Sequence, residues 1–356
     1  MELFNNTFTL AYPSKANRID LYDFLRGIAM LLVLYHHAKL PGKEYVLTFH
    51  MPLFFFLSGF VSSGRTIPWF GDYFIIRFKR LMIPYFVFGV LYVIGWYAIN
   101  TIVHHHYDFH LALLGIITGV TNYVPVAQNG IFWFLFVLFM ADMMTYPINK
   151  FLNNSMWAKL GGAILFMVMS YVTTHYATLT IFTLDKSFMA ASFILFGSYF
   201  KPFCSYYIEN GNNLKVDVAI IVLACIGVWL SESNNDVNVL MYKNQYGNYP
   251  CFFLGAFCGI IATLLIGKYL YKWLRYSNNF GYTLIMWVGF NSLVLFPVHI
   301  MVKVFFAIPV YNLFFPIDSV VRSIIVFITM LLVSIPICNF ITNYMPWMLG
   351  MKKITY

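Results

Sequence analysis

The chain has 356 residues, of which 61% are hydrophobic and only 10% are charged. Soluble domains carry roughly 25% charged and about 45–50% apolar residues, so this composition excludes a water-soluble globular protein. The formal net charge of +9 requires no nucleic-acid partner, because lysine and arginine gather in the cytoplasmic loops of membrane proteins. We therefore expect an all-α polytopic membrane protein whose main partner is the lipid bilayer.

Apolar stretches that could cross a bilayer recur along the whole chain. The sixth of them is short, which leaves a tilted or a re-entrant segment open. No linker or repeat divides the sequence, so we expect one domain over residues 1–356 that starts with a short polar segment at 1–17. The ten predicted transmembrane helices are at residues 20–38, 45–63, 80–100, 130–149, 159–176, 187–201, 215–231, 249–270, 285–312 and 320–344.

Positive charge is distributed unequally between the two sides of this predicted topology. With the N-terminus in the cytoplasm, 16 of the 22 lysines and arginines fall on the cytoplasmic side. The six on the other side are Lys39, Lys43, Lys186, Lys243, Lys303 and Arg322. This asymmetry predicts a multi-pass protein of the cell membrane with both termini in the cytoplasm.

The first predicted span carries ionisable side chains, which cost free energy in a bilayer and are therefore candidates for function. Arg26 lies near its start, and His36 and His37 lie near its end. Eleven residues, or about 16 Å of helix, separate Arg26 from His37, so both lie on one face, whereas His36 is rotated by about 100°. Asp23 is three residues before Arg26 and can pair with it. The alternative is an interfacial ion-pair cluster that also includes Asp20.

Several stretches of the sequence form an ordered set of motifs. The first is Asp23-x-x-Arg26-Gly-x-Ala, followed by His37-Ala38. Four more follow at residues 49–59, 77–85, 132–135 and 291–299. Together they resemble the acyltransferase-3 family of bacterial membrane O-acyltransferases, and most of all its fucose 4-O-acetylase branch. The doubled histidine departs from the pattern and leaves His36 as an alternative to His37.

The resemblance implies acetyl-CoA as the acyl donor, with no metal. Arg77, Lys79 and Arg80 lie on the predicted cytoplasmic side, where the third span begins. Guanidinium groups bind phosphate through two parallel hydrogen bonds, and Arg77 and Arg80 are neighbours on one helical face. On charge alone these residues would be ordinary topogenic anchors. Their similarity to the family's RxxR motif favours binding of the CoA phosphates.

The predicted catalytic residues are His37, Arg26 and His36. An imidazole with an unperturbed pKa of about 6.5 can be neutral at working pH, so His37 could act as general base on an acceptor hydroxyl. Arg26 is too far from His37 to stabilise the same reacting oxygen, which favours a structural or donor-binding role for it. A transient acyl-histidine is the alternative route.

Four further residues are predicted to bind the acceptor, a sugar or glycan: His50, His299, Asn291 and Trp133. Each has a plainer explanation: a polar cap for His50, interhelical hydrogen bonds for His299 and Asn291, and packing for Trp133. Asp142, late in the fourth span, could pair with a cation on the cytoplasmic side.

The histidines at positions 104–106 and 110 have partial metal-ligand spacing, but only Asp108 accompanies them, so we predict no metal site.

Two other functions compete with acyl transfer. A multi-pass transporter or flippase of a lipid-linked sugar would suit ten spans. Transporters often have two similar halves, however, and the charged pattern of the first span does not recur in residues 180–356. A non-catalytic scaffold would not need these histidines and arginines.

Overall fold

The computed structural model describes residues 20–102, 108–119, 133–152, 155–176, 181–211, 213–277, 279–309, 311 and 319–351. Within these ranges the protein is helical and contains no strand, as predicted, apart from an isolated antiparallel bridge between Leu240 and Gln245. The fold is therefore all-α.

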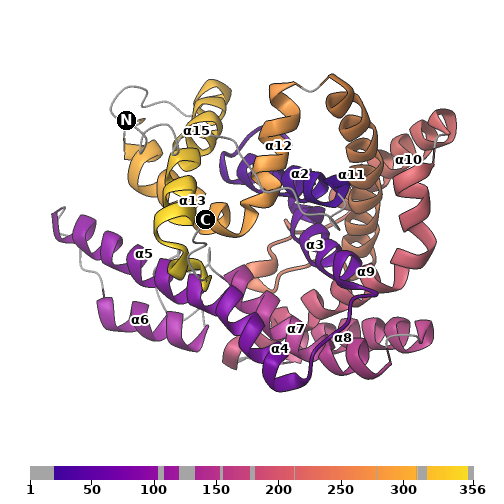
Figure 1. Cartoon of the computed structure of the whole chain (residues 1–356), viewed down its shortest axis with the longest axis horizontal. Helices are drawn as coiled ribbons and strands as arrows, with labels where there is room; N and C mark the ends of the chain where they lie inside the picture. The colour runs from indigo at the N-terminus through magenta and orange to yellow at the C-terminus, as the bar shows by residue number, and fades with distance from the viewer. Residues whose placement is uncertain are drawn as a thin grey trace.

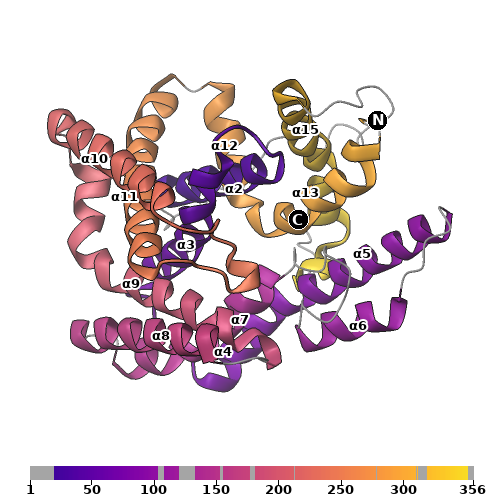
Figure 2. The same cartoon turned by 180° about the vertical axis from the view of Figure 1, so that it is seen from behind.

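The helices are arranged around α2, which lies at the centre of the molecule and packs against α3, α11, α12, α13 and α15 (Figure 1). In the same view α5 to α8 form the lower part, and α10 and α11 lie at the right; Figure 2 shows the arrangement from behind. The helices are α2 (Asp20–His37), α3 (Lys43–Ser62), α4 (Phe70–Arg77), η1 (Phe78–Met82), α5 (Ile83–Ile102), α6 (Phe109–Thr118), α7 (Trp133–Phe151), α8 (Met156–Tyr176), η3 (Ile181–Thr183), α9 (Leu184–Asn210), α10 (Leu214–Ser233), η4 (Met241–Lys243), α11 (Tyr249–Ser277), α12 (Phe280–Phe290), α13 (Ser292–Val302), η5 (Lys303–Ala307), α15 (Val320–Tyr344) and η6 (Pro346–Leu349).

Six helices in the described part of the chain are long and apolar enough to cross a bilayer, or seven if a bent pair counts as one span. They are α3, the continuous α4–η1–α5, α8, α10, α11 and α15, and the bent pair is α12 with α13–η5. Each of the ten predicted stretches contains a helix, but the count of ten is not confirmed. Large apolar side chains lie exposed on the outer surface, for example Leu223 and Trp157, as expected for a protein surrounded by lipid.

The third predicted span, 80–100, is too short. The helix runs without a break from Phe70 to Ile102, with a π-helical turn, η1, between α4 and α5. Pro84 follows this turn and cannot donate a backbone hydrogen bond to the carbonyl of Arg80. A π-turn absorbs that loss without ending the helix. The RxxR residues thus lie well inside a long helix, at and within its distortion.

The ninth predicted span, 285–312, is not one helix. The chain bends by 94° between α12 and α13, and Asn291 is the residue at the bend. Its side-chain amide donates to the carbonyl of Trp287 at 3.0 Å, which is the local bonding that makes asparagine a poor residue inside helices. The bend gives the site described below one of its walls.

The sixth predicted span, 187–201, is short only in its apolar part. Helix α9 extends over 27 residues and packs against α3, α7 and α8. Glycines permit a close approach of α3 and α9. A Cβ atom added to Gly59 would lie 1.8 Å from the carbonyl oxygen of Ile194, and one added to Gly197 would lie 2.0 Å from the carbonyl oxygen of Phe56. Small residues at such crossings are typical of helix packing in membranes.

Candidate active site

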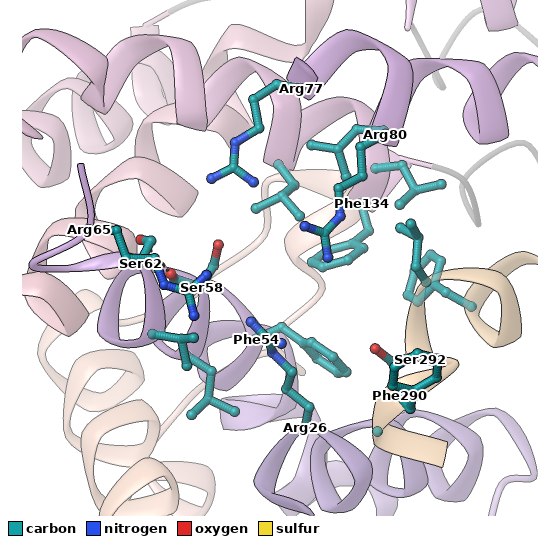
Figure 3. A pocket seen from close by; sticks show the side chains of 18 residues that line it. Arg26, Phe54, Ser58, Ser62, Arg65, Arg77, Arg80, Phe134, Phe290 and Ser292 are labelled. Carbon is teal, nitrogen blue, oxygen red and sulfur yellow. Dashed lines mark hydrogen bonds between the residues drawn. The ribbon is translucent and has the colours of Figure 1, made fainter. Parts of the chain in front are cut away.

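Four arginines converge on one cavity of about 160 Å³. They come from three separate segments: Arg26 from α2, Arg65 from the loop after α3, and Arg77 and Arg80 from α4 and η1. Their guanidinium groups point toward one another across the cavity (Figure 3). Such a concentration of guanidinium groups suits a ligand with several anionic oxygens, such as a phosphate.

The rest of the cavity wall is partly polar and partly aromatic. Ser58 and Ser62 of α3 and Ser292 at the start of α13 contribute hydroxyl groups (Figure 3). Four phenylalanines line the cavity: Phe54, Phe134, Phe290 and Phe296. The cavity can therefore hold an anionic group among the arginines and an apolar group beside the rings.

Carboxylates hold two of these arginines in place. Arg26 pairs with Asp23 across one helical turn at 3.3 Å, and Arg77 pairs with the buried Asp142 at 3.3 Å. The pairing of Asp23 with Arg26 was predicted, and so was a cation for Asp142, which the structure identifies as Arg77. The Arg77 guanidinium also lies 5.2 Å from the ring centre of Tyr73. Four arginines and two carboxylates leave the cavity with a net positive charge.

Arg65 was missed in the sequence, where it appeared as one of many cytoplasmic cations. Its loop is tied to the neighbouring helices through backbone carbonyl groups. The ammonium group of Lys201 donates to the carbonyl oxygen of Ser63 at 2.6 Å. That of Lys150 donates to the carbonyl oxygen of Ile67. Only the three-dimensional path of this loop shows that Arg65 belongs to the cavity.

Lys79 does not line the cavity, although it was predicted to bind the donor with Arg77 and Arg80. Its side chain is exposed, and its backbone carbonyl group lies against Gly350. The two arginines on either side of it face the cavity, so Lys79 is turned away from them.

A second cluster contains four histidines, and all four were predicted site residues. The ring centres of His36 and His37 are 5.0 Å apart. His36 lies 5.4 Å from His50 of α3, and His37 lies 5.2 Å from His299 of α13. The structure thus brings both histidines of α2 into one cluster and gives each a different partner, in keeping with their different helical faces.

Backbone contacts fix the tautomers of the two outer members. Nδ1 of His50 lies 2.9 Å from the carbonyl oxygen of Val46, and Nδ1 of His299 lies 2.9 Å from that of Leu295. Because a carbonyl oxygen only accepts, each Nδ1 carries a hydrogen, and each neutral ring has its lone pair on Nε2. Nε2 of His299 is buried and has no hydrogen-bond partner in the described part of the chain, so His37 has a hydrogen-bond acceptor beside it.

The two clusters lie at different points along α2, which contributes Arg26 to one and His36 and His37 at its last turn to the other. Arg26 lines the cavity with the other arginines, and His37 joins the histidines about 16 Å along the same helix. Aromatic rings lie between them: Phe296 lines the cavity and is 5.9 Å from His299, and its ring lies 4.7 Å from Phe134. Arg26 therefore lies with the other arginines of the cavity and not with the histidines.

The structure places Asn291 and Trp133 in packing positions. Asn291 occupies the bend between α12 and α13, and the Trp133 ring packs against Phe55 and Phe134. The histidines at positions 104–106 lie outside the described residues, whereas His110 is in α6. Among the described residues, no group of histidine, cysteine and acidic side chains has a geometry that could hold a metal ion.

A multi-pass membrane protein with an internal cationic cavity and a histidine cluster has the parts of a membrane-embedded enzyme. Residues 19–339 match the family model described as an acyltransferase domain, Acyl_transf_3. The chain therefore belongs to the acyltransferase-3 family.

One relative among curated proteins is similar to part of the chain. Nodulation protein NolL of Sinorhizobium fredii (strain NBRC 101917 / NGR234) is 25% identical over 171 residues. The match covers 43% of this chain and 43% of that protein, which is less than half of either. No solved structure matches the chain.

Proposed function

We propose that the protein is an O-acyltransferase of the cell membrane that moves an acetyl or similar short acyl group from cytoplasmic acyl-CoA to a hydroxyl of a sugar or glycan. The observation that carries this proposal is the course of α2, which contributes Arg26 to a group of four arginines and, about 16 Å further along, His36 and His37 to a group of four histidines. An acyl-CoA has the matching shape, with phosphates at one end and the thioester at the other.

The arginine cavity is the proposed site for the phosphates of the donor. Arg65 and Arg80 are exposed, whereas the side chains of Arg26 and Arg77 are 29% and 21% exposed. The cavity thus has an outer and an inner pair of cations. Its volume of about 160 Å³ is smaller than the roughly 300–1,000 Å³ of sites that enclose a whole small molecule. We therefore assign it a phosphate-bearing part of the donor, with the thin pantetheine arm continuing past Phe296 toward the histidines.

In the proposed reaction His37 acts as general base. The acceptor hydroxyl oxygen attacks the thioester carbonyl carbon while His37 takes the hydroxyl proton. The tetrahedral intermediate then collapses, the carbon–sulfur bond breaks, and the leaving thiolate takes the proton from the His37 imidazolium. The products are the O-acyl sugar and free CoA, and His37 returns to its neutral form.

His299 is the proposed positioning residue for His37. If the N–H of one His37 nitrogen points to Nε2 of His299, the other nitrogen presents its lone pair to the acceptor. The buried Nε2 of His299, which has no partner among the described residues, supports this orientation. A transient acyl-histidine at His37 is the alternative route, and it would use the same orientation.

Mass spectrometry of surface glycans tests the proposal. In cells that lack the gene, the mass of one surface glycan should fall by the mass of one short acyl group. A gene copy that carries His37→Ala should not restore that mass. An unchanged glycan, together with transport of a lipid-linked sugar by the protein, would instead favour a transporter. Labelled acetyl-CoA supplied to inside-out membrane vesicles distinguishes acetyl from longer acyl groups.

A further inference from the structure

Three lysines surround the histidine cluster at the end of α2 that lies away from the arginines. Lys39 follows His37 by two residues, and Lys43 is the first residue of α3. Lys303 is the first residue of η5 and follows His299 by one helical turn. Its charge acts on the rings of both His37 and His299, and Lys39 and Lys43 lie close enough for their charges to act on Lys303.

These lysines are held by the fold. Lys303 is half-buried, within a helix that continues directly from α13. The carbonyl oxygen of Lys39 accepts a hydrogen bond from the Ser323 hydroxyl of α15 at 3.1 Å. The backbone N–H of Lys43 donates to the carbonyl of Leu40 at 3.2 Å. The turn between α2 and α3 is thus packed onto the molecule, which holds the backbone of Lys39 and Lys43 next to the end of α2 that carries His36 and His37.

No acidic side chain forms an ion pair with any of the three lysines in the described part of the chain. Glu44 is the next residue after Lys43, yet it makes no such pair. Another lysine on the same predicted side, Lys186, does have its own carboxylate, Asp185, at 3.0 Å. Three like charges repel one another, so their grouping costs free energy unless an anion from outside joins them.

Topology does not explain these charges. Lysines that orient a membrane protein gather on the cytoplasmic side, and these three are half of the six cations predicted on the other side. A lysine that only reaches for lipid headgroups extends along the outer surface of a helix end. Lys303 instead lies one turn from a fully buried histidine. Lys303 is therefore positioned to bind a molecule that occupies the site.

We propose that the acceptor is an anionic glycan, with a carboxylate or a phosphate close to the hydroxyl that receives the acyl group, and that Lys39, Lys43 and Lys303 bind this anion. This inference rests on the proposed function. The phosphates of the donor are not the anion, because the arginines that suit them lie about 16 Å away along α2. The anion would orient the acceptor so that its hydroxyl faces His37.

The test uses glycan from cells that lack the gene, incubated with purified protein and labelled acetyl-CoA. One sample is untreated, one has its carboxylates converted to amides, and one is dephosphorylated. Losing a charge-assisted contact should lower transfer by about 10- to 100-fold in one of the two treated samples, and which one responds identifies the anion. Equal transfer to all three samples would overturn the inference. If no acetyl group is transferred to the untreated glycan, the result contradicts the proposed function itself.

Variants separate anion binding from a general effect on the reaction. Lys303→Gln should lower transfer to the untreated glycan by about 10- to 100-fold and raise its KM, while Lys303→Arg retains most of the rate. Acetyl-CoA affinity should not change, which also reports that the variant is folded. Lys243→Gln, an exposed lysine on the same predicted side, is the matched control. A loss of kcat that is the same for untreated and neutralised glycan would assign Lys303 to the reacting oxygen and overturn the inference.

Discussion

Removal of the Arg80 side chain gives the cleanest test of the donor site. Arg77 and Arg80 both line the cavity, but Arg77 is paired with Asp142, whose side chain is only 5% exposed. Arg77→Ala would leave a buried carboxylate without its partner, which costs roughly 3–5 kcal/mol of stability. Arg80→Ala leaves the ion pair of Arg77 with Asp142 in place and should lower acetyl-CoA affinity. The loss of one or more charge-assisted contacts predicts about 1.5–3 kcal/mol, or a Kd raised about 10- to 150-fold.

The assay is calorimetric titration of detergent-solubilised variants with acetyl-CoA. Arg77→Ala combined with Asp142→Asn removes the cation and the carboxylate charge together, so it should recover the thermal stability that Arg77→Ala loses while donor binding stays weak. Arg77→Lys should rescue binding only in part, because an ammonium group cannot form two parallel bonds to phosphate. Lys79→Ala is the matched control: it changes the charge by the same amount, next to Arg80, but outside the cavity.

The reasoning is refuted if Arg80→Ala and the double variant both bind acetyl-CoA as tightly as the wild type. The arginines would then be topogenic anchors, and the cavity would hold another anion. Equal weakening by Lys79→Ala would be a different failure, since it would show that binding follows the total charge of the segment. Titration of the wild type with dephospho-CoA shows whether the 3′-phosphate is among the groups bound.

Three further predictions concern the reaction, the packing and the topology. His37→Ala should lower acetyl transfer by about 10²–10⁴-fold in an inserted protein, whereas His36→Ala should keep substantial activity; equal losses would contradict their different roles. Gly197→Ala should cost about 1–3 kcal/mol in thermal unfolding, because its Cβ would meet the backbone of α3, whereas Gly161→Ala has no atom within 4 Å and should cost nothing. A cysteine at the exposed Thr66 should resist impermeant labels added to intact cells, and labelling from outside would reverse the predicted orientation.

Local helical geometry explains which parts of the site could be predicted from the sequence. Asp23 and Arg26 are one turn apart, so their pairing follows from the spacing alone. The separation of Arg26 from His37 follows from the rise of a single unbroken helix, which α2 proves to be. The pairing of Asp142 needed one further step, because a carboxylate inside an apolar helix requires a cation within reach.

Features that depend on backbone distortions could not be predicted in this way. The π-turn at η1 includes Lys79 and Arg80, and the bend falls at Asn291, but nothing in these polar residues specifies a π-turn or a 94° bend. Hydropathy detects the length of an apolar stretch but not a change in its direction. The predicted ninth span therefore appeared straight, although its bend provides the wall of the cavity that Ser292 lines.

The roles of the arginines depended on contacts between distant segments. In the sequence, Arg26 and His37 share one face of α2, and only their distance along the helix favoured a structural or donor-binding role for Arg26. The folded chain groups Arg26 with Arg65 and Arg80, whose positions are set by a loop bonded to neighbouring helices and by a distorted helix. A shared helical face shows only that two side chains point the same way, whereas a shared cavity shows that they can touch one ligand. Because α2 spans the distance between both clusters, it fixes where the phosphates and the thioester of one donor would lie, and a change in its length by one turn should separate donor binding from transfer.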